Sequence, residues 1–147
     1  MLNNIWKIIF LVFLSSCAND SLLDSENNSS SNPNNLDIIT WNIEHYPKHS
    51  NTNNYLESII NNLEGIDIIA LQEIESSADI NELANNLNGN WTYYRHENSD
   101  WGELSYLINL ETITFQEPYS ILNEHQYYFA YRPPYVLEFN YNNQDFV

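Results

Sequence analysis

The sequence predicts an α+β fold of the layered α/β type, and three observations predict it. Two apolar runs, at 38–39 and 66–69, each end in a short polar string, and an amphipathic stretch at 55–63 lies between them. A second amphipathic stretch follows at 80–87, after which the chain turns to alternating segments rich in aromatic residues. This order predicts strand, helix, strand, helix and then antiparallel strands.

The first strand is predicted over 36–42 and the first helix over 55–63. Asn51 and Thr52 suit the N-cap of this helix, and Gly65 is a typical residue to end it. Its apolar side chains recur at helical spacing and form one stripe: Tyr55, Leu56, Ile59, Ile60 and Leu63.

The next strand is predicted over 66–71, because a nearly continuous apolar run is typical of a strand covered on both faces. Ser76 and Asp79 have the spacing of a capping signal for a second helix, which Gly89 ends. Alternating and β-branched or aromatic residues predict five further strands, at 91–95, 103–109, 112–117, 127–131 and 135–139.

Two polar residues stand where the first two strands end. Asn42 lies in the string Thr40-Trp41-Asn42-Ile43-Glu44, and Glu73 in the string Ala70-Leu71-Gln72-Glu73-Ile74. Strands joined through a helix are usually parallel neighbours, so their carboxyl ends meet at one edge of the sheet. An amide and a carboxylate at that edge could share one hard cation. The simpler alternatives are a turn asparagine and an exposed glutamate.

These strings resemble the opening motifs of the endonuclease/exonuclease/phosphatase superfamily, in which a strand ending in W-N-x precedes a helix and a strand ending in L-Q-E. Two later segments extend the resemblance: 101–108, which contains Glu103, and 129–139, which contains an F-x-R-x-P pattern around Arg132. The resemblance covers residues 36–146. It implies the N-terminal half of a four-layer α/β/β/α sandwich, with one sheet and two helices present.

The resemblance also implies the roles of the site residues. Glu73 and Asn42 would bind Mg²⁺ (or Mn²⁺), Asn42 also orienting a phosphate, Glu103 would orient a histidine, and Arg132 would contact phosphate. The family's catalytic histidine, Asp-x-Asn pair and final Asp-His pair belong to its second half. For Glu103 and Arg132, an outward strand carboxylate and a surface ion pair are the alternatives. Glu44 and His45 are interpreted as loop residues, and the aromatic residues at 127–128 as strand and core filling.

The N-terminus predicts export and lipid attachment. A seven-residue apolar run at 8–14, too short to span a membrane, follows Lys7 and precedes Leu14-Ser15-Ser16-Cys17. This string resembles the lipobox of bacterial lipoproteins, which implies a signal peptide over 1–17 with lipidation at Cys17 and an exported, membrane-anchored protein. Residues 18–35 are mostly Ser, Asn, Asp and Glu, which favours a disordered tether. Residues 36–147 then form the partial domain, long enough for one small core.

The net charge of the chain disfavours duplex DNA as a binding partner. The chain has 4 Lys and Arg against 20 Asp and Glu, a net charge of −16. Duplex DNA is bound largely through Lys and Arg, so a freestanding DNA-binding domain is disfavoured. A metal-dependent hydrolase remains compatible, since the metal brings the phosphate to an acidic site. Its substrate would be a phosphate ester of a nucleic acid, phospholipid or sugar phosphate.

Two other functions remain open from the sequence. One is a non-catalytic surface lipoprotein whose unpaired sheet face packs on a protein partner, and the other is an inactive truncated product. In either reading, and in the hydrolase reading, the inner face of the single sheet is expected to lack a cover.

Overall fold

The computed structural model describes residues 35–97 and 102–147 of the chain. The signal peptide, Cys17 and residues 18–34 of the predicted tether therefore lie outside the described residues. Within the described ranges, no helix has both the length and the apolar character needed to cross a membrane.

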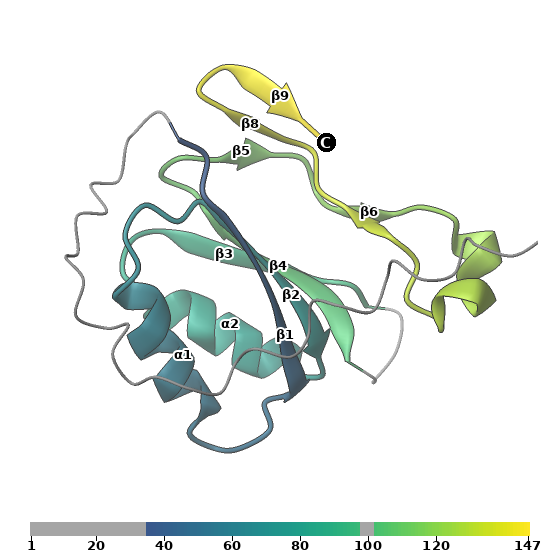
Figure 1. The fold of residues 1–147 in the computed structure, drawn as a ribbon, viewed down its shortest axis with the longest axis horizontal. Coiled ribbons are helices and arrows are strands. Elements are labelled where there is room, and N and C mark those ends of the chain that lie inside the picture. The colour runs from purple at the N-terminus through teal and green to yellow at the C-terminus, as the bar shows by residue number, and fades with distance from the viewer. Residues whose placement is uncertain (1–34, 98–101) are drawn as a thin grey trace, which may run out of the picture.

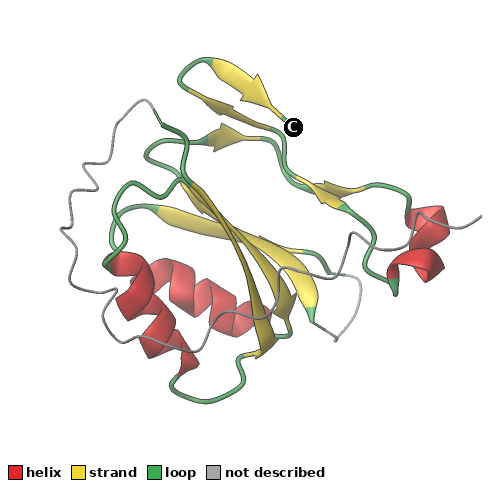
Figure 2. Ribbon diagram, in the orientation of Figure 1, coloured by secondary structure: helices red, strands yellow, loops and turns green. Residues whose placement is uncertain are grey.

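A four-stranded sheet in the order β1-β2-β4-β3 forms the centre of the fold (Figure 1). Strands β1 and β2 are parallel, and β4 pairs antiparallel with both β2 and β3. Two α-helices cover one face of this sheet (Figure 2). The bounds are β1 Ile38–Tyr46, α1 Thr52–Asn61, β2 Ile68–Ile74, α2 Ser77–Asn86, β3 Trp91–Arg95 and β4 Glu103–Asn109. The layered α+β fold predicted from the sequence is confirmed.

The core lies between the sheet and the two helices. Leu56 and Ile60 of α1 and Ile80 and Leu83 of α2 are buried against the sheet. The predicted capping signal is present: the Ser76 side chain accepts a hydrogen bond from the backbone N–H of Asp79. Helix α1 ends earlier than predicted, with its C-cap at Asn62.

The opposite face of the sheet is partly covered, which corrects the expectation of a bare inner face. Ile68 and Ile108 on this face are buried together with Ile113, Leu137 and Tyr141, which come from the last third of the chain. That region forms two small sheets, β5-β8-β9 and β6-β7, and a 3₁₀ helix. The bounds are β5 Thr114–Phe115, β6 Tyr119–Ser120, η1 Asn123–Phe129, β7 Tyr135–Val136, β8 Phe139–Tyr141 and β9 Gln144–Phe146.

The strand predicted over 127–131 is wrong. Its residues belong to the 3₁₀ helix η1 or follow it, and Ala130 and Tyr131 have positive φ angles of 51° and 63°. Left-handed backbone breaks the extended path that a ladder requires. The aromatic residues here favoured a strand by their propensity, but propensity for strands depends on a neighbouring strand to pair with.

Candidate functional site

Asn42 and Glu73 lie side by side where the regular parallel ladder between β1 and β2 ends. Strand β1 itself continues to Tyr46, four residues beyond the end predicted at Asn42. The Nδ2 of Asn42 donates a hydrogen bond of 3.0 Å to Oε1 of Glu73. The register places Asn42 opposite Gln72, one residue before Glu73. The sequence therefore predicted the meeting of these two side chains correctly, while their role in metal binding stays a prediction.

Irregular pairing turns the Glu73 side chain toward Asn42. Between Leu71 and Ile74, strand β2 has one residue more than the β4 segment opposite it, a bulge in the ladder. Glu73 has a φ of 62°, in the left-handed region that glutamate rarely occupies. Bulges of this kind occur beside active sites, where they redirect a side chain. Asn42 lies on the exposed face of β1, and this turn lets the Glu73 carboxylate reach it.

Gly102 makes room for the bulge. A Cβ atom at position 102 would lie 2.9 Å from the Cα of Glu73 and 3.2 Å from its Cβ. Real Cβ atoms do not approach backbone so closely, so any other residue here would displace Glu73. The glycine between Trp101 and Glu103 thus belongs to the same local arrangement as the carboxylate.

The Glu73 carboxylate is held in its charged form. The hydrogen bond from Asn42 is the largest effect that lowers the pKa of Glu73. A hydrogen bond from the backbone N–H of His45 and the positive charges of His45 and Arg132 act in the same direction. An ionised carboxylate at a solvent-accessible sheet edge is a suitable ligand for a hard cation.

Arg132 lies in the segment after η1. The residue is half-buried, and its backbone N–H donates a hydrogen bond to the carbonyl oxygen of Phe129. Its charge is the smallest of the effects that lower the pKa of Glu73. The structure therefore brings Asn42 and Glu73 into contact, while the phosphate-binding role of Arg132 beside them stays a prediction.

Glu103 lies in the same region but is fully buried. Strand register pairs it with Ile74, the residue after Glu73. Its Oε2 atom is 2.9 Å from Nδ1 of His96, whose ring packs at 5.3 Å from the ring of Tyr135. The sequence resemblance implied that Glu103 orients a histidine of the family's second half. In this structure the histidine beside it is His96, directly after β3.

A second histidine–carboxylate pair at this edge was missed by the sequence reasoning. His45 and Glu44 were interpreted as loop residues, but both lie within β1, which continues to Tyr46. Nδ1 of His45 is 2.6 Å from Oε1 of Glu75. The signal was present in the spacing, since His45 and Glu75 follow Asn42 and Glu73 by three and two residues at the same edge.

The residues present fit a magnesium ion. Within residues 35–97 and 102–147, no group of three or more His, Cys, Asp or Glu side chains is placed to hold a metal. Mg²⁺ needs fewer protein ligands than zinc, because it keeps several water ligands and often uses one or two carboxylates. The Asn42 amide and the Glu73 carboxylate offer the hard oxygen atoms that this ion prefers.

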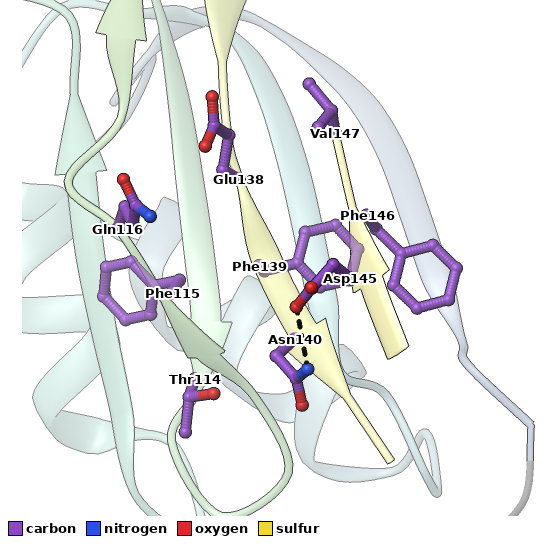
Figure 3. Close-up of a pocket in the computed structure, with 9 residues that line it drawn as sticks. All are labelled: Thr114, Phe115, Gln116, Glu138, Phe139, Asn140, Asp145, Phe146 and Val147. Carbon is purple, nitrogen blue, oxygen red and sulfur yellow. Dashed lines mark hydrogen bonds between the residues drawn. The ribbon is translucent and has the colours of Figure 1, made fainter. Parts of the chain in front are cut away.

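A hollow of about 390 Å³ lies elsewhere, on the small β5-β8-β9 sheet (Figure 3). Phe139 and Phe146 stack in it at 5.1 Å between ring centroids, and Asn140 donates a hydrogen bond to Asp145. Asn42, Glu73, Glu103 and Arg132 do not line it. The hollow brings together fewer side chains suited to metal binding or catalysis than the sheet edge does, so the sheet edge is the better candidate site.

Comparison with known proteins supports the fold. No protein-family model matches this chain, and no curated protein is significantly similar to it. Among solved structures, the chain is similar to a humanized D. rerio TDP2 carrying 14 mutations, with a TM-score of 0.59 and 18% identity. The match covers 75% of this chain and 46% of the TDP2 chain. TDP2 has the endonuclease/exonuclease/phosphatase fold, and at this identity the similarity shows that fold alone.

Proposed function

We propose that this chain is a metal-dependent phosphoric-ester hydrolase domain on a lipid-anchored exported protein. The contact of 3.0 Å between Asn42 and Glu73 carries the proposal. It sets an amide beside an ionised carboxylate at the carboxyl edge of two parallel strands, where sheets of this kind build their sites. The shared fold with TDP2 supports the same class of chemistry.

Each residue of the site has a proposed part. Glu73 and Asn42 hold Mg²⁺ (or Mn²⁺), which when bound polarises a phosphoryl oxygen and stabilises charge on the leaving oxygen. Arg132 binds and orients the substrate phosphate, for which a guanidinium is well suited. Glu103 fixes the ring of His96 from its buried position. The substrate is a phosphate ester, and the net charge of −16 disfavours a long duplex footprint.

We expect the purified chain to hydrolyse phosphodiesters slowly. The chain spans 46% of the TDP2 chain, and the sequence resemblance assigns the family's catalytic histidine to its second half. General acid–base catalysis typically contributes about 10²–10⁴-fold, so turnover should fall short of a complete site by about that factor. The measurement is Mg²⁺-dependent cleavage of bis-p-nitrophenyl phosphate and plasmid DNA, with and without Glu73→Gln.

Three outcomes of this assay are informative. Weak turnover that requires Mg²⁺ and falls further in Glu73→Gln supports the proposed site. Turnover that Glu73→Gln leaves unchanged, or that persists without metal, contradicts it. Fast turnover that Glu73→Gln abolishes keeps the site but shows that this chain activates water by itself.

Lipid attachment is tested separately at Cys17. Because Cys17 is the only cysteine in the chain, replacing it with Ala should abolish labelling by a fatty-acid analogue. The variant should also move from the membrane fraction to the soluble fraction. Labelling that survives Cys17→Ala would show that the lipobox interpretation is wrong.

A further inference from the structure

Exposed apolar side chains gather in one short segment of the molecule. Thirteen large hydrophobic side chains are exposed among the described residues, and six of them lie within residues 121–131. We call this segment the aromatic knob. Its exposed members are Ile121, Leu122, Tyr127, Tyr128, Phe129 and Tyr131.

The exposed side chains of the aromatic knob are not packed in the hydrophobic core. Tyr127 and Tyr128 are 73% and 80% exposed, which corrects their interpretation as core and strand filling. The Tyr127 ring meets those of Tyr128 and Tyr131 nearly at right angles, with centroids 5.7 and 6.2 Å apart. The rings therefore support one another on the surface. Helix η1 projects beyond the small β6-β7 sheet, away from α1 and α2 (Figure 1).

The charge of the aromatic knob limits what it can bind. Residues 121–131 contain one carboxylate, Glu124, and no Lys or Arg, in a chain with a net charge of −16. Nucleic acid is bound largely through several Lys and Arg side chains, and this segment offers none beyond the adjacent Arg132. Tyrosine rings mixed with aliphatic side chains are instead characteristic of the boundary between lipid headgroups and acyl chains.

The length of the preceding chain also favours a lipid surface. If Cys17 is lipidated as proposed, the 18 residues at 18–35 separate the anchor from the domain. A chain of 18 residues spans at most about 59–65 Å when it is fully extended. The domain would thus stay within about that distance of the bilayer, and an exposed apolar surface would meet lipid repeatedly.

We propose that the aromatic knob docks in the headgroup region of a zwitterionic bilayer, as a second membrane contact beside the lipid anchor. This inference rests on the exported, lipid-anchored part of the proposed function and does not depend on the metal site. Zwitterionic lipid is specified because the acidic chain is repelled by an anionic surface. Docking would hold one orientation of the domain at the membrane.

The test uses a single fluorescent label in the full chain. Cys17→Ser removes the only cysteine and the lipid, and Tyr128→Cys then gives one site for an environment-sensitive NBD label. With phosphatidylcholine vesicles, we expect NBD emission to rise and to be quenched by brominated lipid. The matched control is Tyr55→Cys on α1, a tyrosine that is 69% exposed outside the knob, where emission should not change.

A second pair of variants measures affinity in the Cys17→Ser chain. Tyr127→Ser combined with Leu122→Ser should weaken vesicle binding by about tenfold or more, because two side chains lose apolar burial. Tyr55→Ser should leave binding unchanged. Circular dichroism checks that the exposed substitutions leave the fold intact.

Several results would overturn the proposal. One is an unchanged signal at position 128 with vesicles, and another is an equal change at positions 55 and 128. A change caused by single-stranded oligonucleotide, or by raising the protein concentration without lipid, would assign the aromatic knob to nucleic acid or to a second copy of the chain. Because the assay contains no Mg²⁺ and no substrate, these failures are distinct from failure of the proposed hydrolase site.

Discussion

Replacing Glu73 with Gln should remove Mg²⁺ binding from this chain. The substitution keeps the size of the side chain but removes the charge that the Asn42 hydrogen bond stabilises. Loss of a residue that only hydrogen-bonds a metal ligand commonly lowers metal affinity by about 10–100-fold. Loss of the carboxylate ligand itself should lower the affinity further. Isothermal titration calorimetry with Mg²⁺ and Mn²⁺ gives the comparison.

Glu75→Gln is the matched control. Glu75 is two residues further along, also half-buried, and its partner is His45 rather than Asn42. The variant changes the net charge by the same amount, so general attraction of cations to an acidic surface is equally reduced. Equal loss of Mg²⁺ in the two variants would mean that the acidic surface, and not the sheet edge, attracts the ion.

Replacing the buried Arg95 with Ala should lower the free energy of unfolding more than replacing the exposed Lys48 with Ala. The Arg95 side chain is 4% exposed, and its Nε donates a hydrogen bond of 2.9 Å to the carbonyl oxygen of Ile74. Leaving that buried carbonyl without a donor costs about 1–3 kcal/mol, to which the lost packing of the apolar stem adds. The ion pair with Glu97 adds little, because Glu97 is 67% exposed.

Urea unfolding of Arg95→Ala checks this expectation, with Lys48→Ala as control. Lys48 forms an exposed ion pair with Glu44, and such pairs contribute about 0–1 kcal/mol. If the two variants lose the same free energy of unfolding, the buried contact to Ile74 does not stabilise the end of β2. That contact matters for the site, because Ile74 directly follows Glu73.

The part of the fold that builds the site could be predicted from local patterns. Strands β3 and β4 have the predicted bounds, and the Ser76 cap is where its spacing indicated. The meeting of Asn42 and Glu73 followed from the strand–helix–strand order alone. These features depend on residues close in sequence, or on the one rule that such a unit has parallel strands.

The features that the sequence did not predict depend on distant parts of the chain. The left-handed conformation of Glu73 requires the space that Gly102 leaves, 29 residues away. The pair of His96 with Glu103 requires β3 and β4 to be in register. The exposed rings at 127–131 looked like a strand because aromatic residues favour strands, and no local signal showed that a partner strand was missing.

Paramagnetic broadening by Mn²⁺ tests the central claim most directly. In the ¹⁵N-labelled chain, small additions of Mn²⁺ should first broaden the amide signals around Asn42 and Glu73, at the carboxyl ends of β1 and β2. The Glu73→Gln variant should lose this localised broadening. Broadening spread over acidic residues across the surface, or centred on the β5-β8-β9 sheet, would contradict a metal site at this edge.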